Sequence, residues 1–180
     1  MMSKHNDNWF GIMKILHIQK LDVDGTVLWE QRNVRNLLHL EGEEFILRAA
    51  FAGGKNSIVI PENYYLGLDN RLAPAAANTM DDLIGEPTGG GYTRQSISSL
   101  NDFSINLDAE HYIATSPIVA FNAISSFWGP VSNLFLTDKE DNTGSLISTA
   151  VLETPVALEI GQQVTMRIGL LLKDCPTVTE

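Results

Sequence analysis

The sequence predicts a mainly β fold, namely a single jelly-roll-like antiparallel β-sandwich with one short helix. Three observations lead to this prediction. The chain has 180 residues, which suits one domain with a hydrophobic core better than two. Short apolar stretches, about eight or nine in all, alternate with turn residues roughly every ten positions, as in two-sheet sandwiches. Only the stretch 38–52 has the apolar spacing of an amphipathic helix.

The chain divides into an N-terminal arm (1–11), a β-sandwich domain (12–174) and a short C-terminal tail (175–180). Apart from Met1 and Met2, the first eight residues of the arm are polar, and the aromatic pair Trp9 and Phe10 follows them. Two large rings on such an arm need to be buried. They are expected either to cover an edge of their own core or to dock on a neighbouring subunit as an interface.

The first two strands are expected at 12–21 and 26–32, joined as a hairpin by Asp24-Gly25, which is a strong turn signal. The helix is expected at 38–52, with Asn36 as its N-cap and Gly53-Gly54 as its stop signal.

Within the helix, Glu44 and Arg48 are four residues apart and are expected to form an ion pair.

The other strands are predicted at 58–68, 92–98, 103–107, 111–123, 131–137, 145–152, 156–160 and 164–172. Pro61 should displace the start of the first of these towards its C-terminal part. The stretch 164–172 alternates most regularly between apolar and polar residues, so it should be central in its sheet. Turns are predicted at Trp128-Gly129-Pro130, at 138–144 and at 159–162.

The stretch 85–95 combines one proline with three consecutive glycines, so the backbone should make a tight and specified excursion there. Glu86 and Arg94 flank it, with Tyr92 between them. They could be a catalytic acid with its partner or an ion pair that locks the loop. The structural lock is the preferred interpretation, because spacing ties no second carboxylate or nucleophile to the pair.

Composition and motif searches exclude several classes of function. A net charge of -10 argues against nucleic acid as a partner. The sequence contains no run of 18 apolar residues, which a membrane-spanning helix would need. The N-terminus lacks the apolar stretch of an export signal. The glycines lack the lysine of a phosphate loop and precede a strand instead of a helix. No serine has the flanking glycines of a nucleophile elbow.

Neither a metal nor a cofactor is expected. Cys175 is the single cysteine, so an intrachain disulfide or a cysteine-rich zinc site cannot form, which suits folding in a reducing cytosol. The four histidines are scattered, without metal-ligand spacing. The acidic stretch 138–144 lacks the distal glutamate of a calcium loop and is interpreted as a solvated hairpin tip.

Two separated segments together resemble a known pattern. Tyr64-Tyr65-Leu66-Gly67-Leu68 is followed, after a polar and alanine-rich spacer, by Glu86-Pro-Thr-Gly-Gly-Gly-Tyr92-Thr-Arg94-Gln95. This resembles virion structural proteins of tailed bacteriophages, in which a "YLGL"-type strand precedes "E-P-S/T-G-x-G-Y-x-R-Q". Similar features at Asn36, near Trp128 and after 159–161 extend the resemblance over most of the chain.

The resemblance implies a non-enzymatic virion component, either a capsid decoration (cement) protein or another accessory protein that acts through subunit interfaces. It further implies a homo-oligomer, made in the host cytoplasm, whose partners are capsid, neck or tail proteins. An alternative is a tail- or fibre-associated jelly-roll module that binds a glycan or receptor, and a hydrolase ranks third. A glycan module needs exposed aromatic rings in a shallow groove, and the candidates are Trp29, Tyr64, Tyr65, Tyr112 and Trp128.

Overall fold

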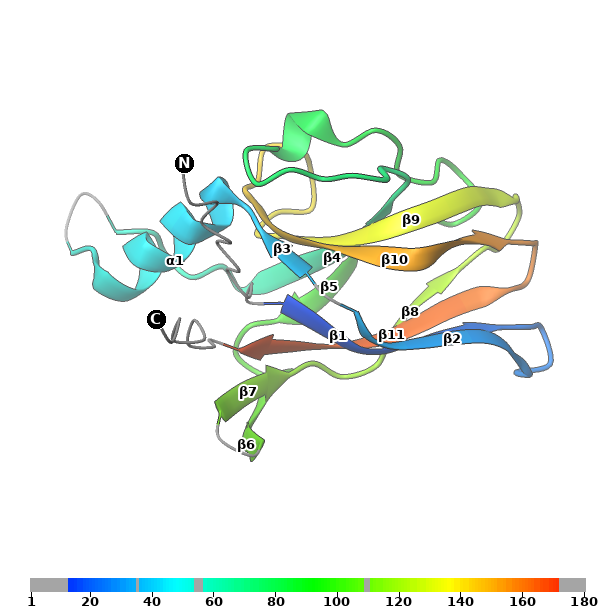
Figure 1. Ribbon diagram of the computed structural model, residues 1–180, viewed down its shortest axis with the longest axis horizontal. Helices are drawn as coiled ribbons and strands as arrows, with labels where there is room; N and C mark the ends of the chain where they lie inside the picture. Colours follow the sequence, from blue (N-terminus) through cyan, green and yellow to red (C-terminus); the bar gives the residue numbers. More distant parts are fainter. Residues whose placement is uncertain (1–12, 35, 54–56, 109–110, 172–180) are drawn as a thin grey trace, which may run out of the picture.

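The computed structural model describes residues 13–34, 36–53, 57–108 and 111–171. In this part of the chain, two antiparallel sheets of six and five strands pack face to face, and one short α-helix lies at one end of the sandwich (Figure 1). The predicted mainly β, antiparallel sandwich with one short helix is therefore confirmed. The arm with Trp9 and Phe10, and the tail with Cys175, lie outside the described residues.

The six-stranded sheet has the order β2-β1-β11-β7-β6, and β8 also pairs with β11. Its strands are β1 (Met13–Leu21), β2 (Val27–Val34), β6 (Ser104–Asp108), β7 (His111–Thr115), β8 (Val119–Asn122) and β11 (Gln163–Leu171). β11 pairs with β1 along one side and with β7 and β8 along the other. It is central, as its alternating apolar pattern predicted.

The five-stranded sheet has the order β3-β10-β9-β4-β5. Its strands are β3 (Asn36–Leu38), β4 (Asn63–Asp69), β5 (Gln95–Ser98), β9 (Trp128–Thr137) and β10 (Leu146–Leu158). β4 starts after Pro61, as expected, because a proline cannot donate to a sheet ladder. The inner faces of both sheets supply the main core, whose fully buried side chains include Met13, Ile15, Ile18, Leu66, Leu68, Phe121, Trp128, Leu134 and Ile168.

The helix α1 (Leu40–Phe51) begins two residues later than predicted. Asn36 is not its cap: it lies in β3, where its Nδ2 donates to Ser148 Oγ at 3.0 Å, and His39 takes the cap position. The predicted ion pair of Glu44 and Arg48 is present at 2.6 Å. A 3-10 turn (Met80–Asp82) is the only regular element in the described connection from β4 to β5.

The predicted turn at Trp128-Gly129-Pro130 is wrong, since these residues begin β9. Trp128 is 2% exposed and pairs with Leu158, so burial of the indole outweighs the turn propensity of its neighbours. The proline is tolerated because the pairing of β9 with β10 is irregular there.

Two predicted strand boundaries are also wrong. The stretch 111–123 is split into β7 and β8 at Pro117, and Ser116 bridges the break by accepting the Ile168 N–H on its Oγ at 3.1 Å. Most of the stretches 145–152 and 156–160 belongs to one strand, β10, which ends at Leu158 and whose register shifts between Val151 and Val156. An irregular ladder lets a strand continue past residues that otherwise read as a break.

Candidate functional site

The glycine-rich loop makes a left-handed excursion, as predicted. Gly89, Gly90 and Gly91 all have positive φ, at 73°, 62° and 88°. The Tyr92 N–H donates to the Gly89 carbonyl at 3.1 Å, and the Ile124 N–H donates to the Gly90 carbonyl at 2.7 Å. These bonds close the loop on itself and fasten it to the segment that follows β8.

Glu86, Tyr92 and Arg94 meet at the base of this loop. Arg94 Nε donates to Glu86 Oε1 at 3.0 Å and Nη2 donates to Oε2 at 2.5 Å, which is a bidentate pair. The Tyr92 hydroxyl donates to Glu86 Oε1 at 2.7 Å. Both oxygens of the carboxylate are therefore engaged, which favours the predicted lock over general acid catalysis. That role in stability stays a prediction until Arg94 is mutated.

Tyr92 ties the lock to the hydrophobic core. Its ring stacks on Phe121 with centroids 6.0 Å apart and meets Trp128 edge-on at 5.5 Å. Its hydroxyl accepts the Leu68 N–H at 2.9 Å. Burial, followed by the negative charge of Glu86, raises the pKa of Tyr92 far above its usual value. The phenol therefore keeps its proton and remains a donor to the carboxylate.

Sequence reasoning missed three residues of this site. The buried carboxylate of Asp69, at the end of β4, accepts the Ile84 and Gly85 N–H groups at 3.1 and 2.7 Å. The Phe135 ring lies 5.0 Å from the Arg94 guanidinium carbon, and Asn142 accepts from Arg94 Nη2. The sequence signal for Asp69 was a polar residue at the end of an apolar strand. Phe135 and Asn142 lie more than 40 positions from Arg94, so no local signal connects them to it.

A hollow of about 210 Å³ lies beside the lock. Its lining includes Asn70, Thr88 and Phe127, whose ring side chain is about half exposed. Trp128 also lines it but is buried. Of the five aromatic residues considered for a glycan groove, Tyr112 is exposed, and it lies on β7 away from this hollow.

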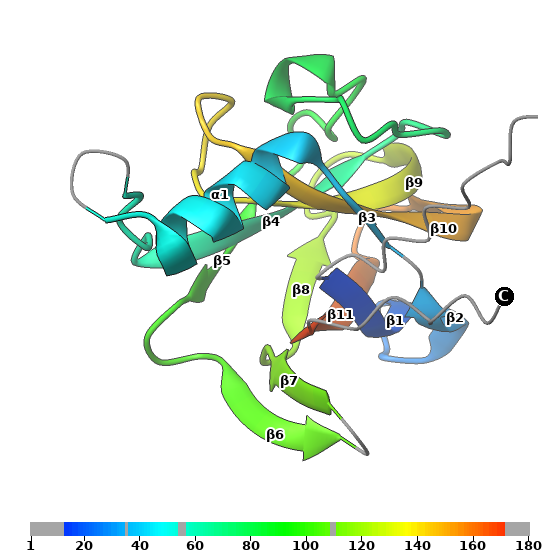
Figure 2. The same ribbon diagram turned by 60° about the vertical axis from the view of Figure 1, so that its left-hand side comes forward.

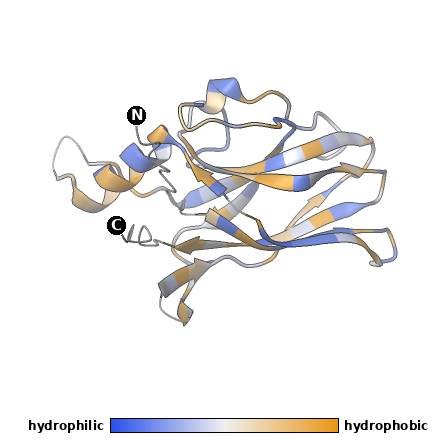
Figure 3. Ribbon diagram, in the orientation of Figure 1, coloured by the Kyte–Doolittle hydropathy of each residue, from blue (hydrophilic) through white to orange (hydrophobic). Residues whose placement is uncertain are grey.

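The outward side of α1 is the second candidate site. Its inward side is packed, with Phe45 and Gly42 buried, yet three large apolar residues point away from the sandwich. Leu40, Leu47 and Phe51 are 55%, 59% and 83% exposed. Figure 3 shows apolar segments on this helix outside the two sheets.

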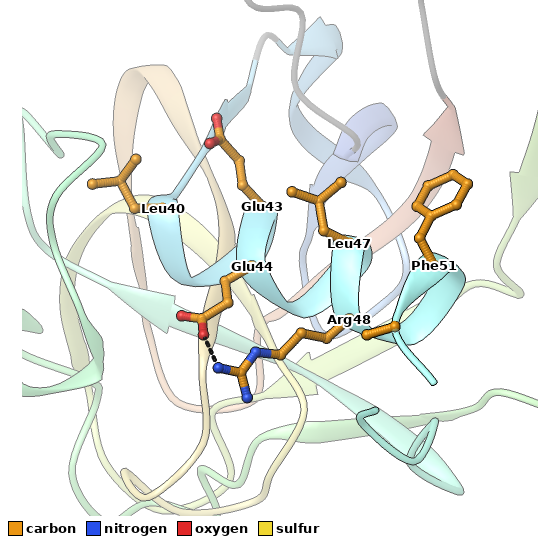
Figure 4. Close-up of a pocket in the computed structure, with 7 residues that line it drawn as sticks. Leu40, Glu43, Glu44, Leu47, Arg48 and Phe51 are labelled. Carbon is orange, nitrogen blue, oxygen red and sulfur yellow. Dashed lines mark ion pairs between the residues drawn. The ribbon is translucent and has the colours of Figure 1, made fainter. Parts of the chain in front are cut away.

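These three residues line a groove of about 460 Å³ together with Glu43, Glu44, Arg48 and Ala52. Figure 4 shows Leu40, Glu43, Leu47 and Phe51 projecting from one side of the helix, with the Glu44–Arg48 ion pair beside them. We call the surface formed by Leu40, Glu43, Glu44, Leu47, Arg48 and Phe51 the α1 outer face. It offers a partner an apolar stripe bordered by charges.

The stretch 138–144 forms a hairpin tip whose carboxylates bond to their own loop. Asp138 accepts the Ser145 N–H at 2.6 Å, and Asp141 accepts both the N–H and the hydroxyl of Thr143 at 2.9 and 2.6 Å. Among the described residues, no three histidine, cysteine or acidic side chains gather as metal ligands do. In the same part of the chain, no helix is long and apolar enough to cross a membrane.

Comparisons with protein-family models and with curated proteins find no match to this chain. Its function is therefore inferred from the α1 outer face, the glycine-rich loop and the sequence pattern that the loop carries.

Proposed function

We propose that this protein is a non-enzymatic structural component of a tailed-phage virion, a capsid decoration or other accessory protein that acts through subunit interfaces. The virion part of the proposal rests on the sequence resemblance, and the observation that carries action through subunit interfaces is the α1 outer face. A helix that is apolar on both sides is normally buried on both sides. In the described residues only the inward side of α1 is packed, so the outward side is available to another subunit.

The spacing of the exposed residues supports a contact along the helix axis. Leu40, Leu47 and Phe51 are seven and four positions apart, which places them on one side of a helix with 3.6 residues per turn. Contiguous exposed apolar surface of this kind marks sites of protein association. The acidic net charge of -10 favours a partner surface with basic groups.

The two segments that resemble virion structural proteins, 64–68 and 86–95, pack against each other in the fold. Tyr65 pairs with Ser96 and Leu66 with Gln95, so the two halves of the pattern are adjacent strands. The Tyr92 hydroxyl joins them again through the Leu68 N–H. Residues that hold two strands and a loop together fit a scaffold, which supports the structural part of the proposal.

The partners proposed for this subunit are other virion proteins, of the capsid, neck or tail, and further copies of the chain itself. The test is to purify particles from cells that produce the protein, to separate heads from tails, and to track the protein with an antibody. A stoichiometric amount in one fraction is the expected result. Protein found entirely outside the particles would contradict the proposal.

One observation favours the alternative of a glycan-binding module. The hollow beside the lock places the half-exposed Phe127 ring near the polar side chains of Asn70 and Thr88. Sugars bind where an aromatic face is combined with hydrogen-bonding groups. A glycan array with the purified protein distinguishes the two functions. A glycan-binding module should give a sugar-specific signal that Phe127→Ala weakens. A decoration protein should give no such signal, with or without the substitution.

A further inference from the structure

The strand β6 is an unprotected edge of the six-stranded sheet. It is the last strand in the order β2-β1-β11-β7-β6, so it has a sheet neighbour on one side only among the described residues. In Figures 1 and 2 the β6–β7 hairpin projects from the lower part of the sandwich, clear of the five-stranded sheet. Such an edge presents unpaired backbone donors and acceptors to another strand.

The other four edge strands carry features that hinder pairing, and the first of them, β8, pairs only with β11 among the described strands and has just four residues. β2 has the exposed charged residues Glu30 and Arg32. β3 has three residues, and the Ser98 N–H of β5 is already bonded to Asp102 Oδ2 at 2.7 Å. Short length, charge and side-chain cover are the usual protections of a sheet edge. β6 is five residues long and has none of these in its middle part, Ile105 to Leu107.

The exposed residues of the hairpin form an apolar side. Leu107 pairs with Tyr112 across the hairpin, and Ile105 pairs with Ala114, so all four lie on the same side of the ribbon. Ile105, Leu107 and Tyr112 are 71%, 61% and 69% exposed. A two-stranded ribbon with so little burial is marginally stable alone, so it gains most from a partner that covers it.

We propose that two copies of this chain pair through their β6 edges, antiparallel, about a two-fold axis at Asn106. The inference deepens the proposed function: the role of the dimer in assembly rests on that function, whereas the pairing itself is argued from the geometry of β6. The two six-stranded sheets then continue into each other through main-chain hydrogen bonds.

The sequence of β6 suits pairing with itself. An axis at Asn106 places Ile105 opposite the partner's Leu107, and Leu107 opposite the partner's Ile105. The apolar sides of both hairpins then lie on one side of the joined sheet and form a single patch with both copies of Tyr112. A partner of another kind would need its own strand of matching pattern, whereas a second copy supplies one by symmetry.

The first experiment measures self-association of the full chain by analytical ultracentrifugation over a wide concentration range. The wild type is expected to form a dimer. The double variant Ile105→Lys, Leu107→Lys should weaken the dimer at least tenfold, because lysine on an edge strand opposes pairing. The control Ile160→Lys changes another exposed isoleucine, 58% exposed at the β10–β11 turn, and should dimerise as the wild type does.

The second experiment tests the register by disulfide formation in a Cys175→Ser background. Opposed residues of antiparallel strands have Cα atoms about 4.5–5.5 Å apart, within the range that a disulfide spans. Asn106→Cys should therefore crosslink the two copies under mild oxidation. Ser104→Cys is the matched control, since it lies about 14 Å from its own copy across the proposed axis and should stay reduced.

A wild type that remains monomeric at every concentration would overturn the inference, as would a dimer that survives the two lysines. Crosslinking through Ser104→Cys but not through Asn106→Cys would overturn it as well. Circular dichroism checks that each variant is folded. The crosslinking experiment uses single cysteine substitutions that should not disturb the fold, so it tests the pairing even if the lysine variant misfolds. Absence of the protein from purified particles would remove the virion proposal and leave the dimer standing, so the two failures are distinguishable.

Discussion

At the scale of single residues, Arg94 joins the glycine-rich loop to two distant parts of the five-stranded sheet. Its side chain is 5% exposed and contacts Glu86 before the loop, Phe135 on β9 and Asn142 in the hairpin tip. Arg94→Ala should lower the free energy of unfolding by about 1 to 3 kcal/mol, because it leaves Glu86 without its cation. Urea unfolding measures this change.

The matched control is Arg32→Ala. Arg32 also pairs with a glutamate, at 3.6 Å from Glu30, but its side chain is 61% exposed. Solvent screens such a pair, so this variant should unfold as the wild type does. Equal stability of Arg94→Ala and the wild type would show that the loop does not depend on the lock.

Two neighbouring glycines allow backbone strain to be separated from crowding. Gly89 and Gly90 both have positive φ, which costs an alanine about 1 kcal/mol or more. A Cβ on Gly89 meets nothing within 4 Å, whereas on Gly90 it would lie 2.2 Å from Ser126 Oγ and 2.8 Å from Trp128 Nε1. Gly90→Ala should therefore lose about 1 to 3 kcal/mol more than Gly89→Ala in thermal unfolding. Equal losses would contradict this packing.

His39 should make stability depend on pH. It is fully buried and its Nε2 lies 3.0 Å from Thr149 Oγ1, with Arg71 and Asp82 as the charged groups nearby. Burial lowers the pKa of His39 below its ordinary value of 6.5. The unfolded chain therefore binds this proton more readily than the folded one, so stability is full above about pH 6.5 and falls as the pH drops below it.

The measurement is urea unfolding of the wild type and of His39→Gln at pH 7.5 and 5.5. The glutamine variant should lose less stability than the wild type between these two values. A wild-type loss no larger than that of the variant would mean that His39 does not titrate in this way.

At the scale of elements, α1 has a packed side and an exposed side, and we propose that the exposed side is used in assembly. Leu47→Lys together with Phe51→Lys should leave the melting temperature unchanged, because both side chains are exposed, and should abolish binding to particles. Leu72→Lys is the control, since Leu72 is 71% exposed outside the α1 outer face. Particle binding that survives the double change would exclude this face as the interface.

The same helix shows why a residue of low helical propensity is present in its first turn. A Cβ on Gly42 would lie 2.2 Å from the carbonyl oxygen of Ile147, so the helix approaches β10 more closely than any side chain allows. Glu41, one residue earlier, accepts the Leu146 N–H at 2.7 Å. Close approach and this hydrogen bond fix α1 on the sheet, which in turn orients its outer face.

At the scale of the whole molecule, the arm at 1–11 is expected to contribute more to assembly than to the fold. Trp9 and Phe10 can each bury roughly 150 to 250 Å² against a partner. Deleting residues 1–10 should leave a folded protein, since the described strands begin at Met13, and should weaken self-association or particle binding. Sedimentation and circular dichroism of the truncated chain measure both properties. An unfolded product would place the two rings in the core instead.

Much of the fold follows from local sequence. Asp24-Gly25 specifies the β1–β2 hairpin, and the alternation in 163–171 specifies a central strand, because both signals act between near neighbours. The meeting of Glu86 and Arg94 was also predictable, because they are eight positions apart and the three glycines between them let the chain turn back.

Tertiary structure alone decided the rest. Asn36 and Gly42 read as a helix cap and a weak helix position, but their contacts are with Ser148 and Ile147, more than 100 positions away. Burial of the Trp128 ring decided that this residue lies in a strand and not in a turn. The exposure of Leu47 and Ile105 was likewise invisible in the sequence, because an apolar residue is inside or outside only once two sheets have packed and the remaining surfaces are left without a partner.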